Sequence, residues 1–138
     1  EYKPSNCGEN CVMYTGTHDN ATFIELLESM DRSQRTLFYQ DLASECDKWD
    51  VRFHCRPSEI DAKSTMQRAR QAVIRVAYAS RAKYVILPLQ DVLGTGTGSR
   101  INTPGTLSDR NWSWRCPAAA LTAALARKLA RAVKDGNR

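Results

Sequence analysis

The sequence predicts an α/β fold in which parallel strands are covered by helices, and three patterns support this prediction. Residues 64–83 have a helical periodicity, and this segment leads without a break into the apolar run Tyr84–Leu87. A strand that is apolar on both faces and directly follows a helix is typical of a parallel sheet buried under helices. An earlier apolar and β-branched run, Cys11–Thr15, predicts a second buried strand.

Between the two predicted strands the sequence indicates three helices. Thr22 and Glu25 fit a capping box, in which an N-cap hydroxyl and a Glu three residues later pair with free backbone N–H groups. The apolar face expected for this first helix comprises Phe23, Leu26, Leu27 and Met30. A second helix is expected over residues 33–46, with Leu37, Phe38 and Leu42 buried. The helix at 64–83 is expected to pack through a stripe made of Met66, Ala69, Val73, Val76, Ala77 and Ser80.

Residues 94–111 are rich in Gly, Thr, Ser, Asn and Pro and predict a long loop. Loops of this length are uncommon in compact domains and tend to be functional. Pro117 and Gly136 mark the approximate start and the C-cap of a final helix. The buried side of this helix is expected at every fourth residue, namely Leu121, Leu125, Leu129 and Val133.

The order strand, helices, strand, loop, helix corresponds to about two β/α units in a single domain piece, residues 1–138. A complete barrel of eight such units takes roughly 250 residues, so this chain is too short to form one. The chain opens without a Met and without a signal-peptide pattern, and we expect it to be a piece of a longer protein.

The chain carries a formal net charge of +5, and much of the excess lies near the C-terminus. The cations of the final segment are Arg127, Lys128, Arg131, Lys134 and Arg138. A basic final helix without a nucleic-acid-binding signature indicates a solvated face, so we expect no nucleic-acid partner. No apolar run approaches the roughly 20 residues that a membrane helix needs, and we expect no membrane association.

Five cysteines are present, and their odd number and their spacing fit no disulfide framework. This pattern favours a reducing, cytoplasmic compartment. Cys7 and Cys11 with His18, or His54 with Cys55, could suggest a metal site, but the paired short spacings of a structural zinc site are missing. We therefore expect no metal, and nothing in the sequence indicates a cofactor.

Polar residues follow the first predicted strand directly, in the run Thr15–Asn20. In β/α proteins the functional groups gather where strands end and loops begin. The carboxylate of Asp19 could accept hydrogen bonds from two neighbouring sugar hydroxyls, and the imidazole of His18 could donate to an adjacent hydroxyl. The same residue types also fit a plain turn made by Asp19 and Asn20, beside a His18 that serves only the local structure. On residue types alone both interpretations stay open.

Three further polar segments follow the second predicted strand: Pro88–Gly94, Arg100–Gly105 and Asn111–Arg115. Amides and aromatic rings around one loop suit carbohydrate, because sugars present hydroxyls to amides and C–H faces to rings. Trp112 and Trp114 could instead hold the loop against the body of the protein, and for Trp114 this structural role is favoured.

Together these segments resemble the motifs of the 4-alpha-glucanotransferases, also called amylomaltases or disproportionating enzymes. The motif Y-T-G-T-H-D-N stands at residues 14–20, P-x-Q-D-x-L at 88–93, R-x-N-x-P-G at 100–105 and N-W-x-W-R at 111–115. Their order and rough spacing agree with the family, and only residues 31–63 match loosely. The resemblance implies the C-terminal portion of a (β/α)8 TIM barrel, about its last two β/α units.

The resemblance also implies an activity, the transfer of α-1,4-glucan segments to an acceptor sugar with retention of configuration. The implied substrate is an α-1,4-glucan or a maltooligosaccharide. Asp19 would be the catalytic carboxylate that stabilises the distorted sugar in the transition state. The residues expected to bind substrate around it are His18, Asn102, Gly96 and Ser99. Gln90 and Asp91 would support the loop from beneath.

The family places its nucleophilic Asp and its acid/base Glu on earlier strands, and neither has a counterpart in this chain. We therefore expect the isolated chain to be inactive. Two departures from the family pattern are small. Ala21 stands where the family usually has Asp, and Thr95 and Thr97 alter the glycine-rich stretch.

Two other hypotheses stay open on the sequence. The chain could be a non-catalytic carbohydrate-binding or assembly module, or it could be an inert remnant. The upstream sequence distinguishes them, because six further β/α units with an Asp and a Glu at strand ends would favour the enzyme. A partial barrel would also expose strand edges, and these would allow association with another chain.

Overall fold

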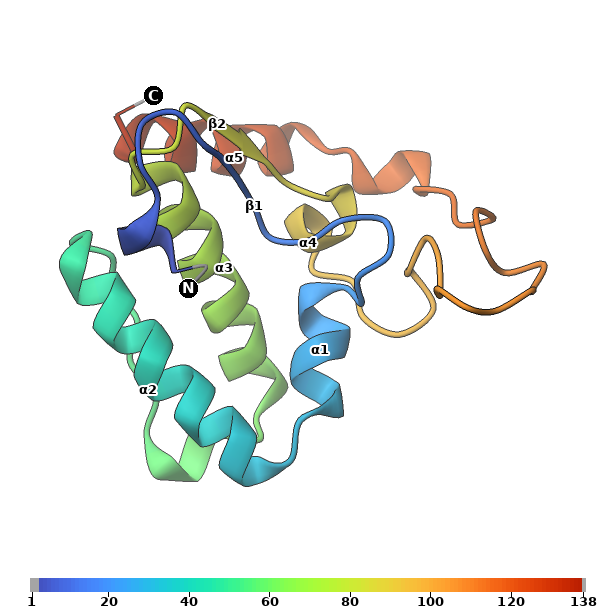
Figure 1. Cartoon of the computed structure of the whole chain (residues 1–138), viewed down its shortest axis with the longest axis horizontal. Coiled ribbons are helices and arrows are strands. Elements are labelled where there is room, and N and C mark those ends of the chain that lie inside the picture. The colour runs from blue at the N-terminus through green and yellow to red at the C-terminus, as the bar shows by residue number, and fades with distance from the viewer. Residues whose placement is uncertain (1–2, 138) are drawn as a thin grey trace.

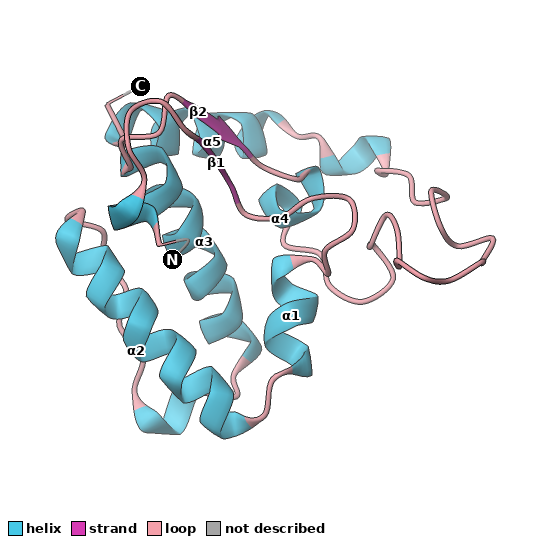
Figure 2. Cartoon of the chain, viewed as in Figure 1, coloured by secondary structure: helices cyan, strands magenta, loops and turns pink. Residues whose placement is uncertain are grey.

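The computed structural model describes residues 3–137, and helices predominate in it. The elements in chain order are η1 (Pro4–Asn6), β1 (Val12–Tyr14), α1 (Phe23–Ser29), α2 (Arg32–Lys48), η2 (Pro57–Glu59), α3 (Lys63–Ala79), β2 (Tyr84–Ile86), α4 (Leu89–Leu93), η3 (Ala118–Ala120) and α5 (Ala123–Asp135), where η denotes a 3₁₀ turn. Figure 2 shows two short strands side by side among longer helices and loops.

The two strands form a parallel sheet, as the sequence predicted. Val12 of β1 lies opposite Tyr84 of β2, and Tyr14 lies opposite Ile86. The crossover between the strands contains α1, α2 and α3. In Figure 1, α3 lies between α1 and α2, and α1, α2 and α5 all pack on it. This arrangement confirms the α/β class.

One face of this small sheet is not covered. Its exposed side chains retain 45–60% of their accessible surface and belong to Val12, Tyr14, Tyr84 and Ile86. Met13 and Val85, which alternate with them, are half-buried. The prediction of two buried strands is therefore wrong for alternate residues, because no element within residues 3–137 covers this face.

Thr22 is the N-cap of helix α1, and its hydroxyl accepts the backbone N–H of Glu25 at 3.2 Å, which confirms the Thr22 half of the predicted capping box. The buried residues of the helix are Phe23, Ile24 and Leu27. Leu26 is 42% exposed, so its predicted place on the buried face is wrong. The buried face is centred on Leu27, and adjacent residues point about 100° apart around a helix.

Helix α2 begins with a capping box made by Asp31 and Gln34. Its buried residues are Arg35, Tyr39, Leu42, Glu45 and Cys46. Leu42 is buried as predicted and Phe38 is partly buried, but Leu37 is 63% exposed. The apolar pattern predicted a buried Leu37, but the polar residue Arg35 lies on the inner face of α2 instead. The guanidinium of Arg35 donates to the backbone oxygen of Leu27 in α1.

Helix α3 is central to the core, and its predicted stripe is confirmed. All six residues of that stripe are buried except Val73, which is partly buried. The helix ends at Ala79, earlier than predicted, where the N–H of Ser80 donates to Val76 and the Ser80 hydroxyl donates to Ala77. The chain therefore turns at Ser80 and can enter β2.

Helix α5 starts later than predicted. Thr122, not Pro117, precedes it, and the Thr122 hydroxyl accepts the N–H of Leu125 at 3.1 Å. Leu121 therefore lies before the helix and is 59% exposed. Gly136 is the C-cap, as predicted. Within residues 3–137 no helix is long and apolar enough to cross a membrane.

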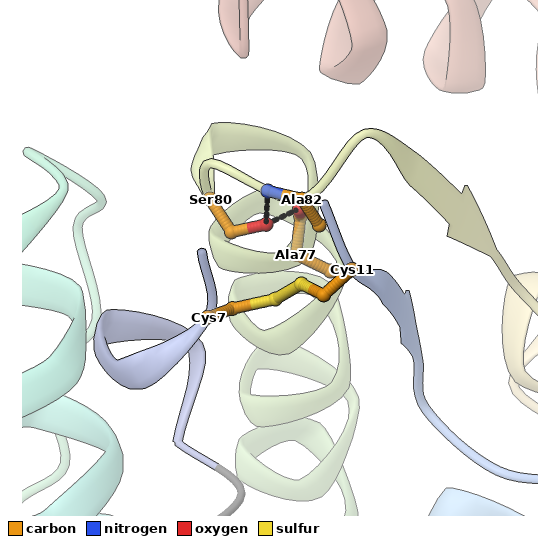
Figure 3. Close-up of a disulfide and its surroundings, with 5 residues drawn as sticks. All are labelled: Cys7, Cys11, Ala77, Ser80 and Ala82. Carbon is orange, nitrogen blue, oxygen red and sulfur yellow. Dashed lines mark hydrogen bonds between the residues drawn. A yellow bond between two sulfur atoms is a disulfide. The ribbon is translucent and has the colours of Figure 1, made fainter. Parts of the chain in front are cut away.

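A disulfide joins Cys7 and Cys11 immediately before β1, close to the end of α3 (Figure 3). The prediction that the cysteines form no disulfide framework is therefore wrong for Cys7 and Cys11. A turn at residues 9–10 brings the two Cα atoms to 6.4 Å, within the range that a disulfide spans. Cys46 is buried and free, and burial raises the pKa of its thiol to about 11.

Neighbouring leucines of α1 provide a test of the core. Leu27 has no exposed surface, so Leu27→Ala should lower the free energy of unfolding by about 2–5 kcal/mol. Leu26→Ala is the matched control and should change it by no more than about 0.5 kcal/mol. Urea denaturation followed by circular dichroism measures both. Equal losses for the two variants would show that α1 is rotated relative to this description.

Candidate functional site

The candidate site lies where β1 and β2 end. Parallel strands end at the same edge of a sheet, so the segment after β1 and the segment after β2 meet there. The first of these segments is the loop 15–22, and the second is α4 with the long loop after it. In Figure 1, α4 lies beside the end of β1, and the long loop, drawn in orange, extends away from the helices.

The carboxylate of Asp91 in α4 holds both ends of the loop 15–22. Asp91 is 3% exposed. Its Oδ2 accepts a hydrogen bond from the hydroxyl of Thr15, directly after β1. Its Oδ1 accepts the backbone N–H of Phe23, at the start of α1, at 2.8 Å. One buried carboxylate therefore fixes the points where the loop leaves the strand and enters the helix.

Asp91 is held in turn by Arg70 of α3. Arg70 is 6% exposed, and its Nη1 donates to the backbone oxygens of Asp91 at 2.6 Å and Val92 at 2.9 Å. Burial lowers the pKa of the Arg70 guanidinium, and the charge of Asp91 acts in the opposite direction. Arg70 was not among the residues predicted from the sequence. Its position could have indicated a role, because Arg70 is an arginine among the apolar residues of the predicted helix 64–83.

The start of the long loop is fixed by two side chains. Gln67 of α3 donates to the backbone oxygen of Gly94 at 2.9 Å. Gly94 has φ +73°, and a Cβ there would lie 2.5 Å from the Gln67 side chain, so glycine is required. Gln90 is 6% exposed and donates to the backbone oxygen of Ser99 at 3.1 Å. Gln90 and Asp91 therefore lie beneath the loop, as the sequence analysis expected.

The tip of the first loop is a turn closed by Asn20. The Asn20 side-chain oxygen accepts from the backbone N–H of Thr17 at 2.7 Å and from its hydroxyl at 2.9 Å. The backbone N–H of Asn20 donates back to Thr17 at 3.2 Å. Asn20 therefore forms a turn, as one of the two interpretations of this segment expected. His18 and Asp19 lie within this turn, with side chains 53% and 46% exposed.

The tip of the first loop, at His18 and Asp19, is held by the long loop through three hydrogen bonds. Asn102 donates its Nδ2 to Asp19 Oδ1 at 2.6 Å and its backbone N–H to the oxygen of His18 at 3.1 Å. Arg100 Nη2 donates to the backbone oxygen of Asp19 at 2.7 Å. These bonds join two loops that lie more than 80 residues apart in the chain. Arg100 was quoted in a motif but was not predicted as a site residue.

The two carboxylate oxygens of Asp19 differ in their surroundings. Oδ1 accepts from Asn102 and lies 3.3 Å from His18 Nε2. Oδ2 takes no hydrogen bond from the residues that the structure describes. An oriented carboxylate with one open oxygen can accept hydrogen bonds from a ligand that offers hydroxyls.

A cavity of about 240 Å³ adjoins this loop. Its lining includes Thr17, His18, Pro88, Arg100 and Ile101. Asp19 and Asn102 are not part of its lining. The cavity thus meets the cluster at His18, and Asp19 and Asn102 stand outside it.

The contacts of Gly96 and Ser99 are with residues other than Asp19. A Cβ on Gly96 would lie 2.9 Å from the Glu28 carboxylate of α1, and the hydroxyl of Thr97 reaches the same carboxylate at 3.4 Å. Ser99 is 5% exposed, and its hydroxyl donates to the backbone oxygen of Gly96 at 2.6 Å. The structure therefore brings His18, Asp19 and Asn102 together, while Gly96 and Ser99 pack the long loop on α1 and α4.

Trp112 also reaches the cluster. Its ring centroid lies 5.0 Å from that of His18, and its backbone N–H donates to Ile101 at 2.7 Å. From the sequence, two roles for Trp112 stayed open, contact with sugar and anchoring of the loop. In the described part of the chain, no group of three or more His, Cys, Asp or Glu residues could hold a metal ion.

A carboxylate, an imidazole and an amide lie together at the C-terminal ends of the parallel strands, and this placement defines the class of protein. This chain has the site placement of β/α proteins that bind and transform small ligands at that edge of their sheet.

Comparison with known proteins is consistent with this class. A 4-alpha-glucanotransferase family model matches residues 1–122. The chain is 34% identical over 133 residues to the 4-alpha-glucanotransferase of Clostridium butyricum, covering 94% of this chain and 23% of that protein. It is 33% identical over 117 residues to the chloroplast and amyloplast 4-alpha-glucanotransferase of Arabidopsis thaliana, covering 83% of this chain and 16% of that protein.

A solved structure agrees. The amylomaltase of Streptococcus agalactiae in complex with acarbose superposes with a TM-score of 0.71 at 27% identity, over 98% of this chain and 23% of that one. The chain therefore belongs to the 4-alpha-glucanotransferase family, as its motifs indicated. It spans 16–23% of the length of these relatives.

The support that Asp91 provides can be tested by removing its carboxylate. Asp91→Ala leaves the buried N–H of Phe23 without an acceptor, which should lower the free energy of unfolding by about 1–3 kcal/mol. Asp91→Asn keeps one acceptor oxygen and should lose less. Thr15→Val, which removes only the other bond, is the matched control. If thermal denaturation shows no difference between Asp91→Ala and the unaltered protein, Asp91 does not hold the loop.

Proposed function

We propose that the protein to which this chain belongs transfers segments of α-1,4-glucans to an acceptor sugar by a retaining mechanism. Membership of the 4-alpha-glucanotransferase family supports the reaction class. The observation that carries the proposal for this chain is the cluster at Asp19. Asn102 donates to its half-exposed carboxylate, and two further hydrogen bonds, from Arg100 and from the Asn102 backbone, fix the backbone of Asp19 and His18. We propose an α-1,4-glucan or a maltooligosaccharide as the ligand of this cluster.

In this proposal Asp19 binds the sugar whose glycosidic bond breaks. As that bond breaks, the ring flattens and positive charge develops at the anomeric carbon. The open Oδ2 of Asp19 accepts hydrogen bonds from ring hydroxyls, and these bonds strengthen as the charge grows. Asn102 holds the carboxylate in place through Oδ1, so little reorganisation is needed during the reaction. The imidazole of His18 binds a hydroxyl of the same sugar from the edge of the adjoining cavity.

The proposal also concerns architecture. We infer that the chain forms the C-terminal portion of a (β/α)8 barrel, about its last two β/α units. The uncovered apolar face of β1 and β2 supports this, because soluble proteins rarely leave such a face open to water. Further units would cover Val12, Tyr14, Tyr84 and Ile86.

A retaining reaction needs a nucleophilic carboxylate and an acid/base carboxylate about 5–5.5 Å apart. In the described residues the carboxylates nearest the loop have other contacts, since Asp91 is fixed beneath it and Glu28 contacts Thr97. We propose that both catalytic groups come from earlier β/α units. The isolated chain therefore supplies sugar contacts without the covalent chemistry.

The role of Asp19 can be tested in the full-length protein. With maltotriose as substrate, the unaltered protein should release glucose and form longer maltodextrins. Asp19→Asn keeps the shape of the side chain but loses its charge, and it should lower kcat by about 100- to 1,000-fold. Asp109→Asn, at an exposed position of the same long loop, is the matched control and should change little.

The outcome is measured by glucose release and by chromatography of the maltodextrins, with circular dichroism as the check on folding. Full activity of Asp19→Asn would refute the assigned role. The 138-residue chain alone should show no transfer, and vigorous transfer by it would contradict the proposed source of the nucleophile. Binding of maltooligosaccharide by a full-length protein that never transfers would instead favour a carbohydrate-binding module.

A further inference from the structure

Trp112 is an exposed aromatic residue beside the proposed sugar site. Its side chain belongs to the long loop between α4 and α5, and the residue is 59% exposed. Its ring lies 5.0 Å from that of His18, with the two planes tilted by 36°. His18 is in turn 3.3 Å from the Asp19 carboxylate. The indole therefore continues the surface formed by His18 and Asp19.

The backbone at Trp112 is strained. Its φ is +63°, a left-handed conformation that bulky residues rarely adopt. Such strain persists only where surrounding contacts impose it, and it concentrates at functional sites and ligand clamps. An observed outlier of this kind calls for an explanation in function.

The contacts that impose this conformation lie on both sides of the residue. The N–H of Trp112 donates to Ile101, next to Asn102, and its oxygen accepts from Arg115 Nη1 at 3.0 Å. The side chain of Asn111 accepts from the N–H of Thr103 at 3.1 Å and donates to the oxygen of Thr106 at 3.1 Å. These bonds fix the backbone of the loop and leave the indole itself uncovered.

A loop anchor would have its ring buried. Trp114, two residues later, is half-buried, and Trp49 packs on the core. Trp112 instead exposes an apolar face of a large aromatic residue, next to polar groups that suit sugar hydroxyls. Aromatic rings of this kind give a large apolar contact area together with a polar edge. The C–H face of a glucose ring matches that surface.

We propose that the indole of Trp112 is a stacking platform for a second glucose unit of the glucan, next to the unit that Asp19 and His18 bind. This inference rests on the proposed function and extends the site by one sugar. Stacking of this kind is made equally with the bound substrate and in the transition state. Its loss should therefore appear in KM more than in kcat.

The test is a kinetic comparison in the full-length protein with maltotriose. Trp112→Ala should raise KM about tenfold or more with kcat nearly unchanged, and Trp112→Phe should recover most of the loss because it keeps a ring. Trp114→Ala is the matched control and should leave KM within about threefold of its original value. An unchanged KM for Trp112→Ala would overturn the proposal. A lower kcat with an unchanged KM would overturn it too, because Trp112 would then only orient His18.

Fluorescence provides a readout that does not require turnover. In the Asp19→Asn protein, maltotriose should change the tryptophan fluorescence, and the change should disappear when Trp112→Phe is added. A change that persists in the double variant contradicts stacking at Trp112. The two failures are distinguishable. A full-length protein without transferase activity refutes the proposed function, whereas an active one that is indifferent to Trp112→Ala refutes only the platform.

Discussion

The structure around the site depends on one buried carboxylate. Asp91 contacts both the end of β1, through Thr15, and the start of α1, through Phe23. Because its backbone is bound by Arg70 of α3, the central helix determines where that carboxylate lies. The parallel pairing of β1 and β2 brings the two segments together, and Asp91 then holds them there. The loop can therefore be short, polar and exposed and still have a defined path.

A second set of bonds orients the tip of that loop. Arg100 and Asn102 reach across from the long loop and bind the backbone and the carboxylate of Asp19. The two sets act on different parts of the same segment, since one fixes its ends and the other fixes its tip. In the proposed function Asp19 stabilises charge on a sugar, and that role needs a carboxylate that does not move during the reaction. The hydrogen bonds of Asp91, Arg100 and Asn102 explain how an exposed loop meets that need.

Much of this could be predicted from the sequence, and the exceptions have physical causes. The parallel strands, the stripe of α3 and the cap at Thr22 followed from local patterns, because each depends on residues close in the chain. Leu26 and Leu37 were misplaced because buried Ile24 and Arg35 shift the inner faces of α1 and α2, which only tertiary packing determines. The motifs indicated His18, Asp19 and Asn102. They did not indicate that Gly96 and Ser99 pack on other parts of the loop and on α1, because that depends on the path of the long loop.

The uncovered face of the sheet bears on the proposal that this chain is one portion of a larger barrel. Apolar side chains on both strands remain uncovered, and the chain spans about a fifth of its relatives. In the proposed barrel, the site described here would be one side of a larger one. The most direct measurement is a crystal structure of the full-length protein with acarbose, the compound bound in the Streptococcus agalactiae amylomaltase. The account predicts a sugar ring whose hydroxyls lie about 3 Å from Asp19 Oδ2, with Asn102 still bound to Oδ1. Acarbose bound with no hydroxyl in contact with Asp19 would contradict it.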